Sequence, residues 1–519
     1  MTVSRSARAV IAALALLLVG AVPVAAQVPD RAAWLRDAVT VGGVLEHLEA
    51  FQAIADAGGG NRLAGAPGHE TSADYVAAKA AAAGLEVSFH DFTYDLDLLA
   101  DWTPPVLEIV SGAEPRAFVP GIAGGVLGGD FGSMYNSPSA DLTAPVWAAD
   151  ITFEPGADNT SGCQAADYAG MPPGAIVLLQ YSEACSLGTK FFGAEQLGAS
   201  AIVFFNESGV DEPIWVNVTG LQVPSVAVTG STAEALANGV TQGLTGVTAR
   251  LKVEWRPGTY ATRNVIAEMR GDPNQVVVVG AHLDSVGTGP GINDNGSGSA
   301  TILEIAEHIR QIRPRATVRF IWFSAEESGL LGSEAYVASL SERERDRIVA
   351  MLNFDMVGSP NFVRFVYDGD LSDSEPPPGG APAGSAEIER VFLDYFAERG
   401  LAVAPTDFDG RSDYGPFIEA GIPAGGLFTG AEGVKTPQQA AVFGGVAGEQ
   451  YDPCYHLGCD DLGNVSVTVL DQMSDAAAHA VAVLSVDPRG VLGRDVRRDR
   501  GSHLPRPTPP RAPLLTPAR

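Results

Sequence analysis

The chain has 519 residues, of which 46% are hydrophobic and 18% are charged, so about two to four domains with packed cores are expected and whole-chain disorder is excluded. Asp and Glu outnumber Lys and Arg by 62 to 33, and because a net charge of −29 repels phosphate backbones, no nucleic-acid partner is expected. Four cysteines are too few for a disulfide-dense scaffold or a cysteine-rich zinc array.

The first 26 residues indicate export. Arg5 and Arg8 precede an apolar run over residues 9–22, Pro23 ends the run, and small residues suitable for cleavage follow. This pattern is typical of a signal peptide. An uncleaved membrane anchor is the alternative, although the run is shorter than the ~20 residues of a bilayer span. The mature protein is therefore expected to be secreted, extracellular or periplasmic, with no membrane attachment after signal cleavage.

Residues 27–118 are expected to form the first part of a core domain. Residues 43–57 and 70–83 predict helices, of which the second ends at Gly84, and residues 85–93 alternate like a strand.

Residues 119–252 have a different composition, rich in Gly, Thr, Ser and Val. Short apolar runs at 175–180 and 201–205 predict strands, and a helix-like segment at 191–197 lies between them. This region is expected to be a small β-rich domain inserted into the core.

Residues 253–487 alternate between strand-like and helix-like segments. This alternation predicts an α/β fold with a mostly parallel, mixed sheet sandwiched by helices. The runs VVVVG and VRFIWF are apolar throughout, as expected of central strands covered on both faces. Strands are expected at 276–280, 318–324, 350–354 and 424–428, and helices at 297–312, 333–340, 386–398 and 467–485.

Residues 488–519 are rich in Arg and Pro and lack apolar periodicity. They are expected to form a disordered tail. A basic anchor to an anionic cell surface is the alternative.

The four cysteines form two local groups. Cys163 and Cys185 lie in the inserted region, and Cys454 and Cys459 lie near the end of the core. Because export permits disulfides and the number is even, we expect the pairs Cys163–Cys185 and Cys454–Cys459. Free buried thiols are the alternative.

Chemically active side chains follow the predicted strands. His282 and Asp284 come directly after VVVVGA, and Asp294 lies in GINDNGSG, which opens a helix. Ligands of α/β sheets bind beyond the carboxyl ends of strands. Taken singly, the histidine can equally be a partly buried polar residue, and the aspartate a helix N-cap.

Three further segments also carry candidate acidic or histidine side chains at strand ends or in loops. Glu326 and Glu327 end the strand-like FIWFSAEE, Asp355 ends MLNFD, and His456 lies in YDPCYHLGCDD. Two adjacent acids at a strand end repel each other unless a cation is present. A solvated helix start is the alternative for the two glutamates.

As a set, these residues predict a metal centre. Two imidazoles and three carboxylates without a thiolate suit zinc, with cobalt or manganese as possible substitutes. Such a set suffices for two ions if one carboxylate bridges them, and Glu326 then remains as a general base. The five candidate ligands are His282, Asp294, Glu327, Asp355 and His456.

The order of these residues resembles the co-catalytic di-zinc aminopeptidases, the secreted bacterial and vacuolar leucyl-type enzymes of metallopeptidase family twenty-eight. The resemblance covers about residues 30–115 and 255–486. Its supporting segments are GRSDYGPF, AGIPAGGLFTG and CYHLGCDDLGNV. Residues 120–250, with SGCQAADYAG and GASAIVFFNES, resemble the protease-associated (PA) domain that many members carry as an insert.

The resemblance implies two zinc ions per chain. His282 and Asp355 would hold one ion, Glu327 and His456 the other, and Asp294 would bridge them. The catalytic residues would be Glu326 as general base towards a metal-bridging water, Tyr455 as donor to the tetrahedral oxyanion, and Asp284 as the residue that orients His282.

The resemblance also implies a substrate site. Arg411 would lie with the acids around the free N-terminus of a peptide or protein. Met356, Phe428 and Gly410 would line an apolar pocket for its first side chain. The expected enzyme is a monomeric aminopeptidase that removes large apolar residues.

Two other functions remain open at this point. A carboxypeptidase or dipeptidase on the same scaffold would need a basic group for the substrate carboxylate, and Arg411 is the obvious candidate. A non-catalytic peptide-binding relative would use the inserted region for recognition and would need no metal.

Overall fold

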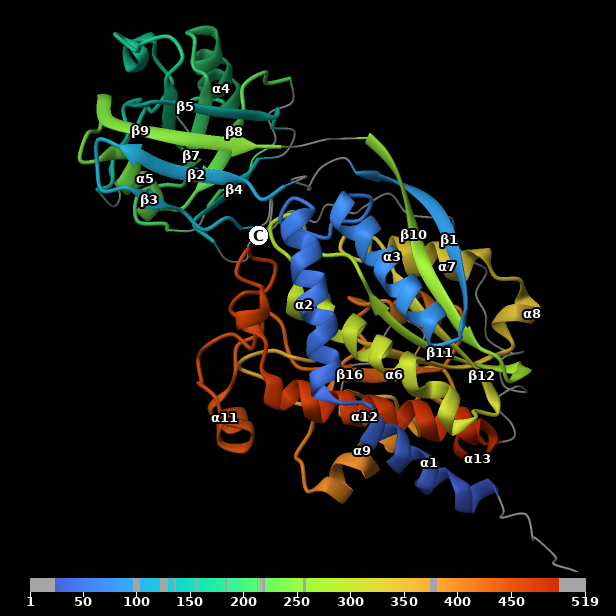
Figure 1. Cartoon of the computed structure of the whole chain (residues 1–519). Coiled ribbons are helices and arrows are strands. Elements are labelled where there is room, and N and C mark those ends of the chain that lie inside the picture. The colour runs from blue at the N-terminus through green and yellow to red at the C-terminus, as the bar shows by residue number, and fades with distance from the viewer. Residues whose placement is uncertain are drawn as a thin grey trace, which may run out of the picture.

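The computed structural model describes residues 24–493 apart from short gaps, which are 97–102, 122–128, 135–136, 155–156, 158, 183, 212, 215, 217–219, 255–257 and 374–379. The expected signal peptide lies outside the described residues up to 23, and the first helix, α1, begins at Val24. Of the expected tail, residues 494–519 lie outside them, whereas Pro488–Leu492 form helix α13. Figure 1 shows two bodies, each built on one sheet.

The larger body holds an eight-stranded mixed sheet. Its four central strands, β12, β11, β13 and β16, are parallel, whereas β1, β10 and β14 pair antiparallel with their inner neighbours. The expected α/β fold is thereby confirmed. In spatial order the strands are β1 (Glu86–Leu96), β10 (Gly258–Met269), β12 (Ala316–Phe323), β11 (Asp272–His282), β13 (Ile348–Phe354), β16 (Ala424–Phe428), β14 (Phe365–Tyr367) and β15 (Ala404–Thr406).

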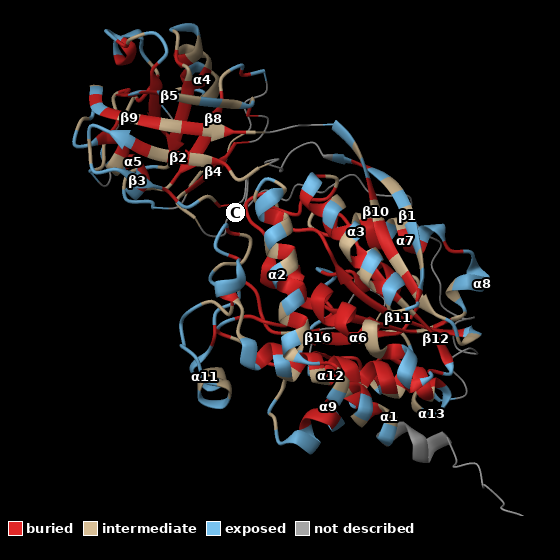
Figure 2. Ribbon diagram, viewed as in Figure 1, coloured by how far each residue is buried: buried red, intermediate tan, exposed pale blue. Residues whose placement is uncertain are grey.

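Helices cover both faces of this sheet. On β11, Val277 and Val279 pack into the cluster beneath α1 (Val24–Ala38), α2 (Val41–Ala57), α3 (Pro67–Ala82), α6 (Gly298–Ile312), α9 (Ser385–Arg399) and α12 (Val467–Val486). Val276 and Val278 pack on the opposite face with α7 (Leu331–Ser339) and α10 (Tyr414–Glu419). Both faces of the strand are therefore dry, which explains its continuous apolar sequence. Figure 2 shows the contrast between these buried strands and the exposed outer sides of α2 and α3.

The remaining helical segments of the larger body are short. They are α8 (Glu342–Arg345), α11 (Pro437–Phe443), α13, a π-helical turn at Ile292–Ser297 and a 3₁₀ turn at Leu462–Asn464. Among the described residues, no helix combines the length and apolar character that a membrane span requires.

The smaller body holds the second eight-stranded sheet. Helix α5 (Gly230–Ala237) covers one face and α4 (Leu187–Gln196) the other, and a 3₁₀ turn occupies Ala165–Tyr168. The strand order is β3 (Arg116–Ala117), β2 (Val106–Ser111), β9 (Gly243–Val253), β5 (Ala140–Ala148), β6 (Ile176–Gln180), β7 (Ala201–Phe205), β8 (Ser225–Val228) and β4 (Phe131–Ser133). The two expected disulfides are confirmed, with Cys163–Cys185 in this body and Cys454–Cys459 in the larger one.

The smaller body starts earlier than the expected boundary at residue 119. Strands β2 and β3 pair within the second sheet, β2 directly with β9. A strand such as VLEIVS carries no signal for the sheet it joins, so the change of composition further along was a poor guide to the boundary. The described residues at the two ends of this body lie together, because Thr103 accepts a hydrogen bond from Lys252 Nζ at 3.0 Å and donates one to Glu254 Oε2 at 3.1 Å.

Candidate metal centre and active site

The candidate residues gather at the carboxyl edge of the central parallel strands. His282 ends β11, Glu326 and Glu327 lie in the turn after β12, and Asp355 follows β13. Neighbouring parallel strands end at the same edge of a sheet, so separate segments of the sequence meet there. His456 reaches this edge from the loop that the Cys454–Cys459 disulfide closes.

Asp294 stands between two groups of side chains. Its Oδ1 is 3.3 Å from His282 Nε2, which is also 3.3 Å from Asp355 Oδ1. Its Oδ2 is 3.0 Å from His456 Nε2, which is also 3.0 Å from Glu327 Oε2. All five predicted ligands are thus brought together, and each oxygen of Asp294 belongs to a different group.

The donor set fits two divalent cations. Glu327 Oε1 and Asp355 Oδ1 are buried and have no hydrogen-bond partner among the described residues, while Ser412 occupies the other oxygen of Asp355. Buried carboxylate oxygens without partners are costly unless a cation compensates them. Imidazole and carboxylate ligands at these spacings suit zinc.

Asp284 holds the turn that carries the two glutamates. Its carboxylate accepts the backbone N–H groups of Glu326 and Glu327, at 3.2 and 3.4 Å. His282 Nδ1 lies 3.1 Å from the main-chain carbonyl of Asp284 and 3.7 Å from its carboxylate. The backbone oxygen therefore faces Nδ1 more closely than the carboxylate does, and Nε2 is turned towards Asp294 and Asp355.

Asp460 fixes the turn that presents Asp294. The two oxygens of Asp460 accept the backbone N–H groups of Asn293 and Asp294, each at 2.9 Å. The peptide bond between Asp294 and Asn295 is cis. Asp460 is not among the residues predicted from sequence, although it directly follows Cys459 of the loop disulfide.

Arg62 lies beneath the centre and is fully buried. Its guanidinium donates to the carbonyls of Leu283, Pro290 and Gly291, which belong to the segments leading to Asp284 and Asp294. Burial lowers the pKa of Arg62 to about 10, although the surrounding acids oppose this shift. The residue remains a cation at neutral pH and partly offsets the acidic charge above it. Arg62 could not be recognised from the sequence, because it lies more than 220 residues from the segments it contacts.

The acids of the centre strongly perturb their neighbours. Burial raises the pKa of Glu326 well above its usual range, and the charges of Glu327 and Asp355 add to this effect. Burial alone would lower the pKa of His456, but Glu327 and Asp294 overcome it and raise the pKa to about 10. Perturbed groups of this kind, clustered in a cleft, are typical of catalytic sites.

The centre opens into a cavity. Met356, Phe428, Arg411 and Tyr455 line it, whereas Gly410, which was expected beside Met356 and Phe428, does not and lies in the adjoining turn, where its N–H donates to the Tyr414 hydroxyl. A glycine offers no side chain to a wall, which explains its absence from the lining. Further lining residues that sequence analysis did not identify are Tyr367, Thr406, Asp407, Asp409, Ser412 and Ala431.

Arg411 is engaged on the cavity rim. It forms an ion pair with Glu432 at 2.7 Å and donates a hydrogen bond to the hydroxyl of Tyr455 at 3.2 Å. Burial, together with the charges of Asp294 and Glu327, raises the pKa of Tyr455 above its ordinary value. The phenol therefore keeps its proton, and that proton is available for donation into the cavity.

Comparison with known proteins gives one family for each body. Residues 264–481 match Peptidase family M28, and residues 142–236 match the PA domain. An aminopeptidase of Pseudomonas aeruginosa is 40% identical over 457 residues, covering 86% of this chain and 81% of the relative. Leucine aminopeptidase 2 of Trichophyton rubrum is 42% identical over 350 residues, covering 67% and 68%. A zinc aminopeptidase from Bacillus subtilis has a TM-score of 0.50 at 25% identity, covering 84% of this chain and 94% of that structure.

Proposed function

The chain belongs to peptidase family M28 and is a metallo-aminopeptidase with an inserted PA domain, and we propose that it is a secreted enzyme that uses two zinc ions to remove large apolar residues from peptide N-termini. The observation that carries this proposal is the position of Asp294, whose two oxygens face two separate histidine–carboxylate groups. Secretion is supported by the N-terminal sequence pattern and by two disulfides, which persist in oxidising compartments.

The two groups around Asp294 would hold the ions. His282 and Asp355 would bind one, His456 and Glu327 the other, and Asp294 would bind both. When bound, zinc supplies Lewis-acid polarisation of the scissile carbonyl and lowers the pKa of water.

Glu326 would transfer a proton from the attacking water to the leaving amine. It lies beside the ligand Glu327, and its Oε2 is 3.9 Å from His282 Nε2. Its raised pKa makes its carboxylate a stronger base towards water than an ordinary glutamate, and the protonated form can return the proton to a leaving amine. Tyr455 would donate a hydrogen bond to the oxygen that becomes negative in the transition state.

The remaining lining residues would select the substrate. The α-amino group of a peptide is cationic or near its pKa at neutral pH, and the carboxylates of Glu326 and Asp355 would receive it. Met356, Phe428 and Tyr367 would contact an apolar first side chain. Because Arg411 is paired with Glu432, it is poorly placed to receive a substrate carboxylate, which argues against a carboxypeptidase.

Three substrates and a metal count test this proposal. We expect rapid hydrolysis of Leu-p-nitroanilide, no hydrolysis of its N-acetylated form, and no hydrolysis of an N-blocked peptide with a free C-terminus. A chelator should abolish activity, zinc should restore it, and elemental analysis should find zinc lost from Asp294→Ala. Cleavage of the N-blocked peptide alone would show a carboxypeptidase, and a fully active protein without any transition metal would refute the zinc assignment.

A further inference from the structure

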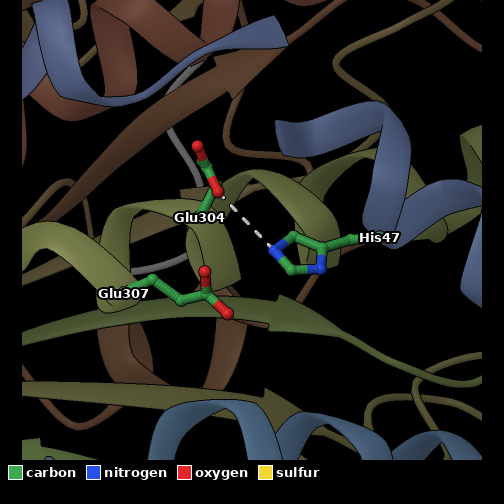
Figure 3. A group of neighbouring side chains, drawn as sticks. All are labelled: His47, Glu304 and Glu307. Carbon is green, nitrogen blue, oxygen red and sulfur yellow. Dashed lines mark ion pairs between the residues drawn. The ribbon is translucent and has the colours of Figure 1, made fainter. Parts of the chain in front are cut away.

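A second group of histidine and carboxylate side chains lies between α2 and α6 and shares no residue with the active-site cavity. His47 projects from α2, and Glu304 and Glu307 project from α6 (Figure 3). One ligand atom of each residue lies within 4.8 Å of the other two. None of the three belongs to the catalytic set.

His47 is buried with one ring nitrogen unused. Its side chain is 2% exposed, its Nδ1 lies 2.8 Å from the Tyr75 hydroxyl, and its Nε2 has no hydrogen-bond partner among the described residues. Nε2 points at Glu304 Oε2 across 3.7 Å, which is too long for a hydrogen bond. Two ligands of one tetrahedral zinc ion lie about 3.4 Å apart, so this spacing suits a shared cation better.

The acids on α6 share one face of the helix. Glu304, Glu307 and His308 stand at positions i, i+3 and i+4, and His308 Nε2 is 3.5 Å from Glu304 Oε1. Glu304 Oε1 also accepts the backbone N–H of Thr40 at 3.3 Å, which holds the carboxylate in place while its Oε2 faces His47.

The surroundings of the group are those of a built site. Tyr75 holds Nδ1 of His47, as an outer partner holds a metal-binding imidazole, and leaves Nε2 free to bind. A Cβ on Gly43 would fall within 2.5 Å of all three carboxylate atoms of Glu304, so only glycine lets α2 approach this closely. Lys79 Nζ lies 3.3 Å from Glu307 and is the charge that a cation would displace.

We propose that His47, Glu304 and Glu307, with His308 at the edge, form a third metal site that binds a divalent transition ion such as zinc and fastens α2 to α6. The chemistry of the ligands is the same nitrogen and carboxylate chemistry that zinc takes elsewhere. Helix α6 begins directly after the turn that carries Asp294. The third ion therefore stabilises the helix behind the catalytic centre without contacting substrate.

Metal counting on the full-length enzyme tests the site. After saturation with Zn²⁺ and removal of unbound ion, we expect three zinc ions per wild-type chain and two in Glu307→Gln and in His47→Gln. The activity of both variants on Leu-p-nitroanilide should stay near wild type. Glu307 is the safer position for folding because a quarter of its side chain is exposed. Lys79→Gln is the matched control, since it removes the ion pair between Lys79 and Glu307 but keeps Glu307 as a ligand. This variant should bind the third ion at least as tightly as the wild type does.

Thermal unfolding gives a second measurement that is independent of catalysis. In an Asp294→Ala background, Zn²⁺ should still raise the unfolding midpoint, and adding Glu307→Gln should make that rise smaller. Equal zinc counts in wild type, Glu307→Gln and Lys79→Gln, together with unchanged zinc-dependent midpoints, would overturn the third site while leaving the aminopeptidase proposal intact.

Discussion

At the scale of single residues, Glu326 and Glu327 are adjacent yet have different surroundings. Glu327 lies 3.0 Å from His456 within the group that would hold an ion, whereas Glu326 faces the cavity with a strongly raised pKa. Adjacent side chains project to different sides, so one strand end can supply both a ligand and a base.

Replacing Glu326 with Gln should separate these two roles. We expect Glu326→Gln to keep wild-type zinc content and to lose turnover by about 10²–10⁴-fold, since the amide cannot carry the proton. Steady-state kinetics measure the turnover, and elemental analysis measures the zinc content. The control is Glu327→Gln, which should lose zinc as well as activity. Near-wild-type turnover in Glu326→Gln would assign the base elsewhere.

Tyr455 provides a second test at this scale. Tyr455→Phe should lower kcat by about 10²–10³-fold with little change in KM, because the hydrogen bond is made mainly to the transition state. Arg411→Lys is a useful companion, since it disturbs the partner of the tyrosine hydroxyl but keeps that hydroxyl. A rise in KM alone for Tyr455→Phe would indicate a role in ground-state binding.

Three of the side chains predicted from sequence share one property. His282 is the last residue of an apolar strand, and Glu326 and Asp355 follow such strands within three residues, so the strand pattern places them at the ligand-binding edge. Asp460 and Arg62 could not be found in this way. Their importance depends on hydrogen bonds to backbone groups that are remote in sequence, and no local pattern records such contacts.

At the scale of elements, α12 carries a pH-sensitive contact. His479 packs between α1 and α9, with its Nδ1 2.8 Å from Arg36 Nη1 and its ring 4.9 Å from that of Tyr395. Burial, with added repulsion from Arg36 and Arg399, lowers the pKa of His479 to about 4. The neutral imidazole is therefore the form that the fold accommodates.

The sign of the resulting pH dependence follows from proton uptake. The unfolded chain binds a proton on His479 near pH 6.5, whereas the folded chain binds it only near pH 4. The contribution to stability is complete above pH 6.5 and is lost progressively as the pH falls from 6.5 to 4, by about 3 kcal/mol. Urea unfolding at several pH values should show that His479→Gln loses less stability than wild type between pH 7 and 4. Parallel curves for the two proteins would contradict this assignment.

Regular elements were predictable where a single periodicity persists. The expected helices at 43–57 and 467–485 correspond to α2 and α12 within about two residues. Strand β10 was not predicted. It lies at the antiparallel side of the sheet, and its sequence mixes apolar residues with charged and polar ones, so its apolar signal is weak. Strands β14 and β15 have only three residues each, too few to show a period.

At the scale of the whole molecule, the two ends of the insert lie next to each other. The contacts of Thr103 with Lys252 and Glu254 hold the first and last described segments of the insert together. Strands β1 and β10, which flank the insert in sequence, are paired directly with each other in the larger sheet. The larger body therefore does not need the insert to close its sheet.

Removal of the insert tests this independence. We expect that replacing residues 103–254 with a short Gly/Ser linker leaves a cooperatively folded, zinc-binding protein that cleaves Leu-p-nitroanilide within about tenfold of the wild-type kcat/KM. Circular dichroism, zinc analysis and kinetics would show this. Measuring kcat/KM of both proteins on a longer peptide would show whether the insert restricts the access of substrates to the active site. If the protein without the insert aggregates with two different linker lengths, the two bodies stabilise each other and the expected independence is wrong.

The division of the chain into bodies was only partly predictable. A change in composition shows that residues 119–252 differ from the core. It does not show that β2 and β3 belong to the second sheet, because β2 joins that sheet by pairing with β9, more than 100 residues further along the chain, and β3 pairs with β2. Strand pairing across such separations depends on the tertiary fold, which local composition does not encode.

The buried guanidinium of Arg62 bears on the order in which the enzyme is assembled. Because a permanent cation already stands beneath Asp284 and Asp294, the polypeptide can bring its acids together during folding at reduced electrostatic cost. Capture of ions can then follow folding as a separate step, because the side chains that would hold them are already in place.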